Sequence, residues 1–450
     1  MKDMNQYKKL IMALASALNI AMHAFIFGYT WFGFYSSKII VPFWERGNYV
    51  MIMVYAIIYV LFAHVFGALK VGYLRTIDVS FSQVLAICFT NMVTYLQLTL
   101  INRWFMDFKP LIVMTVVQGI CGFVWVWCSR CMNRKLYPPH QMLVVYGQYD
   151  YEDMLVKMER RHDKYNIRAS INISEGMEKI KEVIPHYEAI VLYDLPAEER
   201  NIILKYCFQQ SIRVYVTPKI SDIILNGTDT IHLFDTPLLL ARNNGLNFQQ
   251  RFFKRILDLV ISLLMLIVTA PFFIVVALII HLYDKGPVFY KQDRLTLNGK
   301  VFKIYKFRSM CQDSEVNGAR LAMKDDDRIT PIGKFLRKTH LDELPQLINI
   351  ISGDMSIVGP RPERPEIAEQ YEESIPEFSY RLSMKAGLTG YAQVYGKYNT
   401  TPYDKLKLDL LYLENYSVFL DLKLILMTFK IIFQKENTEG VDANQTTAQK

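Results

Sequence analysis

The chain has 450 residues, of which 52% are hydrophobic, and its formal net charge is +8. A mean hydropathy of +0.12 is high for a purely soluble protein, so we expect part of the chain to lie in a membrane. The positive charge suits contact with anionic lipid and phosphorylated substrates, whereas the sequence has no basic run interleaved with aromatic residues, which argues against nucleic acid as a partner.

Four apolar stretches fill the first 130 residues. Each runs for about 18 residues or more with almost no charge, which is long enough to cross the hydrocarbon core of a bilayer. They are residues 11–34, 49–69, 84–101 and 111–128. We therefore predict that residues 1–135 form a bundle of four transmembrane helices. A buried helix of a soluble core is the alternative for any one stretch, and four in succession argue against it.

The loops between these stretches differ in positive charge. Eight lysine and arginine residues flank the stretches on the side of the N-terminus, and four lie on the opposite side. By the positive-inside rule, the N-terminus and everything after Arg130 face the cytoplasm. The sequence thus predicts a multi-pass protein of the cytoplasmic membrane with its soluble parts inside the cell.

From residue 142 the pattern changes to short apolar runs that alternate with amphipathic stretches. Residues 142–146, 189–193 and 213–216 predict buried strands with helices between them. This βαβ pattern predicts a Rossmann-like cytoplasmic domain over residues 136–248. Its first strand ends in one glycine, Gly147, where a dinucleotide-binding loop needs three, so a regulatory or oligomerising role is favoured over nucleotide binding.

A second long apolar stretch, residues 256–282, contains Pro271. Proline removes a backbone hydrogen bond and kinks a helix, and each arm of roughly 14 residues is too short to cross a membrane. We predict a re-entrant helix-break-helix over residues 256–283, with Pro271 as its hinge and Lys254, Arg255 and Asp258 as anchors at the membrane interface. A kinked full span that exports the C-terminal part is the alternative.

The rest of the chain predicts short elements. Two β-rich runs flank Asn298-Gly299, a strong signal for the turn of a β-hairpin, and the second run leads into Lys306 and Arg308. Residues 406–433 predict an amphipathic helix or helix pair at the membrane interface. Residues 436–450 are polar and are predicted to be a disordered tail.

Two adjacent carboxylates, Asp342 and Glu343, stand at an expected helix start, and Arg361 follows between two prolines. One carboxylate can attack phosphorus, a second can hold a divalent cation, and an arginine can bind phosphate oxygens with two parallel hydrogen bonds. The alternative is a solvated acidic helix start followed by a stiff loop. His340 is either a general base or a bystander, and residues 325–327 offer an acidic metal-binding cluster of an ordinary glycosyltransferase as a further alternative.

Five segments in order resemble the bacterial sugar transferases, the monotopic phosphoglycosyl transferases that start glycan assembly on a polyprenyl phosphate. The segments are residues 254–258, 306–310, 342–347, 353–362 and 387–394. The resemblance implies an α-rich monotopic catalytic domain over residues 249–435. The preceding part resembles the long-form members, whose extra domain is similar to a degenerate CoA-binding fold. The expected fold class is thus a membrane protein of α plus α/β type.

The resemblance also implies a two-step exchange. Asp342 would attack the sugar-bearing phosphorus of a nucleotide sugar, with UDP as the expected nucleotide, and undecaprenyl phosphate would then take the phosphosugar from the enzyme. Glu343 would bind Mg²⁺. The product would start exopolysaccharide, capsule or O-antigen synthesis in the bacterial inner membrane. A non-catalytic membrane scaffold or nucleotide sensor is the alternative function.

Six further side chains match family positions near substrate phosphate. They are Arg361, Arg337, Arg308, Lys306, Lys397 and Gln393. The chain departs from the family at Lys397, where arginine is common, and lysine cannot make the bidentate fork of a guanidinium group. The expected partners are a nucleotide sugar, polyprenyl phosphate, membrane lipid and a second copy of the chain in a homodimer.

Overall fold

The computed structural model describes residues 2–147, 151–242, 245–310, 329–397 and 400–432. These residues fall into two compact units, Met1–Thr217 and Pro218–Lys450. The second unit begins earlier than the boundary predicted at residue 249. The reason is that helix α8 (Ile220–Asn226) buries Ile220 and Ile223 against Leu406 and Leu410 of helix α14 (Pro402–Glu414).

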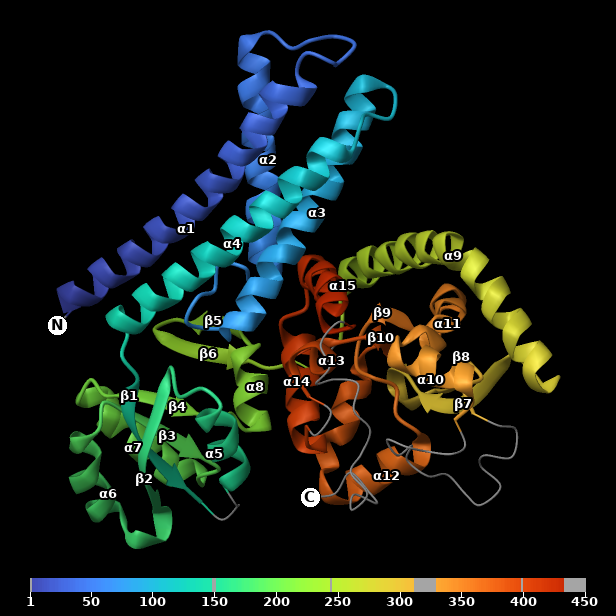
Figure 1. The fold of residues 1–450 in the computed structure, drawn as a ribbon. Coiled ribbons are helices and arrows are strands. Elements are labelled where there is room, and N and C mark those ends of the chain that lie inside the picture. The colour runs from blue at the N-terminus through green and yellow to red at the C-terminus, as the bar shows by residue number, and fades with distance from the viewer. Residues whose placement is uncertain (1, 148–150, 243–244, 311–328, 398–399, 433–450) are drawn as a thin grey trace. The chain divides into compact units, whose positions relative to one another are not determined.

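Four long helices open the first unit: α1 (Lys2–Thr30), α2 (Glu45–Phe66), α3 (Thr76–Asn102) and α4 (Lys109–Leu136). Helix α1 packs against α2 and α4, and α3 packs against the same two helices (Figure 1). Each is long and apolar enough to cross a membrane, as the sequence predicts. Inside the bundle, the buried Tyr59 hydroxyl lies 2.7 Å from both Asn19 Oδ1 and Gln83 Oε1.

A parallel sheet completes the first unit, with strand order β2-β1-β3-β4. Apolar side chains of one sheet face pack against α5, and those of the other face pack against α6 and α7. The strands are β1 (His140–Tyr146), β2 (Tyr165–Asn172), β3 (Ala189–Tyr193) and β4 (Arg213–Val216), and the helices are α5 (Glu152–Glu159), α6 (Met177–Val183) and α7 (Ala197–Gln209). The three predicted strands and the βαβ pattern are confirmed. Strand β2 was not predicted, because it lies at a sheet edge and half of its residues are polar.

The second unit combines short sheets with helices. Strands β5 (Asp229–Leu233) and β6 (Thr236–Leu240) form an antiparallel hairpin, as do β7 (Phe289–Leu295) and β8 (Val301–Phe307), whereas β9 (Ser356–Val358) and β10 (Gly387–Thr389) pair in parallel. The hairpin predicted around Asn298-Gly299 is confirmed. The helices are α8, α9 (Phe248–Asp284), α10 (Pro331–Lys338), α11 (Gln346–Ser352), α12 (Pro365–Ser374), α13 (Tyr391–Tyr395), α14 and α15 (Val418–Ile432).

Helix α9 runs for 37 residues with Pro271 inside it. Its start is fixed by Asn247, whose side chain accepts a hydrogen bond from the Gln250 N–H. Figure 1 shows two straight arms that meet at a bend midway along the helix. The predicted break is thus a bend within a continuous helix, as a proline that removes one backbone hydrogen bond produces. By length and composition α9 is a fifth helix that could cross a membrane.

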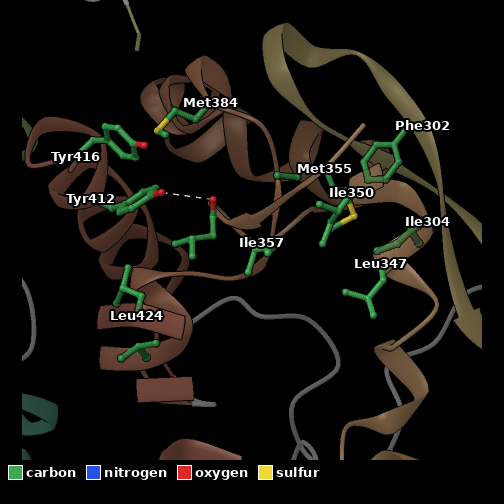
Figure 2. Close-up of a cluster of buried hydrophobic side chains, with 13 residues drawn as sticks. Phe302, Ile304, Leu347, Ile350, Met355, Ile357, Met384, Tyr412, Tyr416 and Leu424 are labelled. Carbon is green, nitrogen blue, oxygen red and sulfur yellow. Dashed lines mark hydrogen bonds between the residues drawn. The ribbon is translucent and has the colours of Figure 1, made fainter. Parts of the chain in front are cut away.

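The core of the second unit gathers apolar side chains from segments far apart in sequence (Figure 2). Phe302 from β8, Leu347 from α11 and Leu424 from α15 are all buried there. The Tyr412 hydroxyl donates to Asp421 Oδ1 at 2.6 Å and lies 3.4 Å from the Val358 carbonyl oxygen, which brings α14 to the end of β9. The loop after β9, which carries the predicted phosphate ligand, therefore leaves from a tightly packed centre.

The C-terminal segment forms two helices, α14 and α15, so the predicted helix pair is confirmed. Both carry buried residues on one side, among them Leu406 and Leu424. The predicted tail at 436–450 and the acidic cluster at 325–327 lie outside the described residues.

Candidate active site

The acid pair lies in a single 3-10 turn, Leu341–Glu343, directly before α11. The turn follows His340, whose φ of 54° places it in the left-handed region and reverses the chain after α10. The predicted helix start is thus a separate turn that Pro345 divides from α11. A 3-10 turn places successive side chains about 120° apart, yet Lys306 lies near enough to both carboxyl groups for its charge to lower the pKa of each.

Glu343 binds two cations through one oxygen. Its Oε1 lies 2.7 Å from Lys306 Nζ and 3.1 Å from Arg361 Nη2. The side chain is only 14% exposed, and burial by itself raises the pKa of a carboxyl group. The attraction of Lys306 and Arg361 outweighs this effect, so the pKa of Glu343 lies far below its usual value. Glu343 is therefore a permanent anion at neutral pH.

Asp342, its neighbour, has the opposite shift. Burial raises the pKa of the Asp342 carboxyl group, the charge of Glu343 raises it further, and Lys306 and Arg337 oppose the rise. Adjacent carboxyl groups whose environments push their pKa values apart commonly serve different roles in an active site. Here Asp342 is the more basic of the two carboxyl groups, while Glu343 stays charged.

Arg361 is presented by the loop that follows β9. The Gly359 N–H donates to the Thr389 carbonyl at 2.9 Å, and the Gly387 N–H donates to the Pro360 carbonyl at 2.9 Å. A side chain at Gly359 would overlap backbone atoms of the neighbouring segment, so the two chain segments cross in direct backbone contact. The Arg361 side chain is 51% exposed and reaches Glu343 from this fixed base.

The other predicted phosphate ligands lie at different distances from the acids. Arg337 in α10 donates from Nε to the Ser309 hydroxyl at 2.9 Å, and its charge acts on Asp342. Arg308 is buried just beyond β8. Gln393 in α13 donates to the Leu388 carbonyl at 3.2 Å, and Lys397 lies exposed beyond α13. Among the contacts of the described residues, Lys306 and Arg361 both form ion pairs with Glu343.

Lys254, predicted as a membrane-interface anchor, instead has protein partners. Its side chain is 7% exposed, and its ammonium group lies 2.7 Å from Asp421 Oδ2 in α15. It also donates to the Val358 carbonyl at 2.9 Å and to the Tyr412 hydroxyl at 3.1 Å. A lysine can be buried in this way because a carboxylate neutralises its charge. The residue fastens α9 to the centre of the unit.

Arg255 and Asp258 correct the same prediction. Arg255 donates to two carbonyl groups near the end of α11, at 2.6 and 2.8 Å, where a positive charge suits the helix dipole. Asp258 is buried and accepts hydrogen bonds from the Ser356 hydroxyl and the Ile357 N–H, each at 2.9 Å. These residues lie in the first turns of α9, where Asp258 falls inside the apolar stretch, and they hold β9 and α11.

Sequence reasoning missed two buried ion pairs. Arg381 lies 2.8 Å from Asp409, and Asp421 is the partner of Lys254. Asp409 stands on α14 between Leu406 and Leu410, which are both buried. A charged residue on the apolar face of a predicted helix was the available signal. No local pattern marks Arg381, because its partners are distant in the sequence.

Comparison with known proteins gives relatives for this part of the chain. Residues 249–435 match the family described as bacterial sugar transferase. A UDP-glucose:undecaprenyl-phosphate glucose-1-phosphate transferase of Klebsiella pneumoniae is 41% identical over 209 residues, which are 45% of this chain and 43% of the relative. A UDP-N-acetylgalactosamine-undecaprenyl-phosphate N-acetylgalactosaminephosphotransferase of Aeromonas hydrophila is 34% identical over 253 residues, which are 55% of this chain and 59% of the relative. The chain thus matches about half the length of these two relatives.

A third relative is matched almost completely. The exopolysaccharide production protein PSS of Rhizobium leguminosarum bv. phaseoli is 43% identical over 184 residues, which are 39% of this chain and 92% of the relative. The acid pair, Arg361 and their supports all lie inside the matched family region. The chain belongs to the bacterial sugar transferase family.

Proposed function

We propose that this protein is a phosphoglycosyl transferase that moves a sugar 1-phosphate from a UDP-sugar to undecaprenyl phosphate and so starts the assembly of a surface polysaccharide: exopolysaccharide, capsule or O-antigen. The observation that carries the proposal is the electrostatic division of the acid pair. Glu343 is held ionised by Lys306 and Arg361, while burial makes its neighbour Asp342 more basic. The names of the relatives support the donor and acceptor classes.

In the first step, an oxygen of the Asp342 carboxylate attacks the phosphorus that carries the sugar. The bond from that phosphorus to the bridging oxygen of the diphosphate breaks, and nucleoside monophosphate leaves with the electron pair. The phosphosugar remains on Asp342 as an acyl phosphate. Arg361 and Lys306 offer cationic donors to the phosphate oxygens, where negative charge is concentrated in the transition state.

In the second step, an oxygen of undecaprenyl phosphate attacks the same phosphorus. The bond to the Asp342 oxygen breaks, which restores the carboxylate and leaves the sugar on an undecaprenyl diphosphate. The positive charges of Lys306 and Arg337 oppose the effect of burial on the pKa of Asp342 and so favour its ionised form. This helps Asp342 both as the attacking group in the first step and as the leaving group in the second. The attacking atom is an anionic oxygen in each step, of a carboxylate in the first and of a phosphate in the second, so neither step needs a general base.

Mg²⁺ belongs to the same proposal. This ion prefers hard oxygen ligands and often binds one or two protein carboxylates together with substrate phosphates and water. Within the described ranges, no group of three or more His, Cys, Asp or Glu side chains forms a metal site of its own. The residues therefore fit an ion held jointly by Glu343 and the donor phosphates. When bound, it would neutralise charge on the diphosphate.

The arrangement in the membrane is also a proposal. Both substrates meet at the cytoplasmic surface of the bacterial inner membrane if α9 enters and leaves on that face, and the bend of α9 supports such a re-entrant course. Arms of about 14 residues are too short to span the bilayer. That the protein forms a homodimer stays a separate prediction.

Trapping the intermediate tests the chemistry. Full-length protein in lipid nanodiscs is mixed with Mg²⁺ and a panel of UDP-sugars labelled on the sugar-bearing phosphate, and is then quenched in denaturant. We expect label on the wild-type protein that undecaprenyl phosphate discharges, and none on Asp342→Asn. Asp354→Asn is the control, because Asp354 is a partly exposed acid paired with Lys300 at 3.4 Å.

Two outcomes would contradict the proposal in different ways. Product formation without any labelled protein at early times would rule out the covalent step. If no donor in the panel released nucleoside monophosphate, the non-catalytic scaffold or nucleotide sensor would replace the enzyme as the better hypothesis.

A further inference from the structure

The loop that carries Arg361 is held mainly through its carbonyl groups. Arg361 stands between Pro360 and Pro362, which have no N–H. The backbone therefore lacks one hydrogen-bond donor on each side of Arg361. The Pro360 carbonyl accepts from the Gly387 N–H at 2.9 Å, and the Glu363 carbonyl accepts from the Leu295 N–H at 3.0 Å. Between them, the Arg361 carbonyl accepts from a side chain, Nη2 of Arg381, at 2.9 Å.

Arg381 lies in the short 3-10 segment Pro376–Ser383 and is 3% exposed. The same Nη2 is 2.8 Å from Oδ2 of Asp409, which is 1% exposed in α14. Nη1 is 3.7 Å from the Glu363 carboxylate, and the guanidinium carbon is 4.9 Å from the centre of the Phe378 ring. One buried guanidinium group therefore contacts the loop on both sides of Pro362.

Stability alone is a weak reason for such a pair. Burying two charges carries a large desolvation cost, and well-packed apolar side chains of similar volume often give an equally stable protein. An apolar pair at these positions would fill the same space but would leave the Arg361 carbonyl without its donor. What the ion pair adds is a planar donor in a fixed orientation, aimed at the backbone of the phosphate-binding residue.

We propose that Arg381, oriented by Asp409, is a positioning residue that fixes Arg361 for phosphate transfer. This rests on the proposed function, in which Arg361 contacts the transferring phosphate. Arg381 sets the position of the Arg361 main chain from behind, and the exposed end of Arg361 reaches Glu343 and the substrate. Displacing a catalytic group by about 1 Å can lower the reaction rate roughly a hundredfold, so loss of the contact from Arg381 should have a measurable effect on kcat.

A double-mutant cycle tests whether Arg381 acts through Arg361. The variant Arg381→Met/Asp409→Leu removes both charges together and leaves neither unpaired. Nucleoside monophosphate release by full-length protein gives kcat and KM with and without Arg361→Met. In protein that retains Arg361, we expect Arg381→Met/Asp409→Leu to lower kcat about tenfold to a hundredfold and to change KM less than about threefold. In the Arg361→Met background, we expect the same double substitution to lower kcat less than about twofold.

Two further variants separate positioning from folding. Lys407→Met removes an ion pair with Asp404 on the same helix, α14, and should keep wild-type kcat. Arg381→Lys keeps a charge for Asp409 without the guanidinium fork, so it should retain the melting temperature and only part of kcat. If Arg361→Met turns over too slowly for steady-state kinetics, the rate of a single turnover at enzyme excess, followed by nucleoside monophosphate release, supplies the same cycle.

Equal losses in the two backgrounds would overturn the positioning role, because the effect would then not pass through Arg361. Unchanged kcat in Arg381→Met/Asp409→Leu would overturn it as well. Neither result touches the proposed function, which stands or falls on nucleoside monophosphate release by the wild-type protein.

Discussion

Replacing Lys306 with methionine tests whether the charge of Glu343 depends on its two cations. The Lys306 ammonium lies 2.7 Å from Glu343 Oε1, and the two side chains are 21% and 14% exposed. Removing one partner of a fully buried pair costs about 3–5 kcal/mol. Here solvent screens part of the interaction and Arg361 remains 3.1 Å from the same oxygen. We therefore expect a loss of about 1–3 kcal/mol at pH 7.

The loss should depend on pH in a defined direction. The folded-state pKa of Glu343 lies below the value of 4.5 for an ordinary glutamate. Its contribution to stability is thus present above pH 4.5 and disappears as the pH falls below that value. Lys306→Met removes part of this contribution. The difference in stability between wild type and variant should therefore persist from about pH 7 down to 4.5, and the two should converge only below that value, as Glu343 becomes protonated.

Apparent melting temperature of the detergent-solubilised protein measures both effects. A change of 1 kcal/mol shifts it by about 2–4 °C in a unit of this size, so the variant should melt roughly 2–12 °C lower at pH 7. Lys300→Met is the matched control, because Lys300 is 69% exposed and its partner Asp354 is 3.4 Å away. A variant that melts with the wild type at pH 7, or that stays equally below it at every pH, would refute the electrostatic reasoning.

Three further predictions concern the supports of the site. Lys254→Met should cost about 3–5 kcal/mol because it leaves Asp421 buried without its cation, although the Tyr412 hydroxyl still donates to it. Lys254→Met/Asp421→Leu should cost much less in the same melting assay, and equal costs would contradict the ion-pair argument. Gly359→Ala should abolish nucleoside monophosphate release, because the added methyl group would overlap a backbone carbonyl. The control Gly119→Ala should retain this activity, because no atom lies within 4 Å of the added methyl group. Activity in both variants would show that the close backbone contact at Gly359 is not required. Pro271→Leu should straighten α9 and carry its C-terminal end across the bilayer with loss of activity, and cysteine labelling that still finds this end on the cytoplasmic side would refute the re-entrant course.

Local signals in the sequence predicted much of the fold. Alternating apolar runs predicted β1, β3 and β4, and the Asn298-Gly299 turn predicted the hairpin of β7 and β8. Strand β2 and the hairpin of β5 and β6 were missed. Strand β2 is polar at half of its positions, and β6 opens with Thr236 and Pro237 before three leucines, so neither shows the alternation of a half-buried strand.

The site residues that could be predicted are those marked by their immediate neighbours in the sequence. Asp342 and Glu343 are adjacent in the chain, and two prolines mark Arg361. The partners of Lys254 could not be predicted, because Asp421 is 167 positions away and the pairing exists only after α9 and α15 pack together. A lysine beside an apolar segment therefore resembled a lipid anchor until its buried partner was known.

The shared oxygen of Glu343 has a consequence for how phosphate enters the site. Lys306 and Arg361 already hold an anion that is part of the same fold, at an effective concentration that dissolved phosphate cannot match. An incoming phosphate must therefore displace the Glu343 carboxylate from Lys306 and Arg361, because these cations are already paired. A small monovalent anion gains little from such an exchange, whereas a diphosphate brings more charge and a second point of contact. Under the proposed function, we therefore expect Glu343 to favour a diphosphate donor over small monovalent anions.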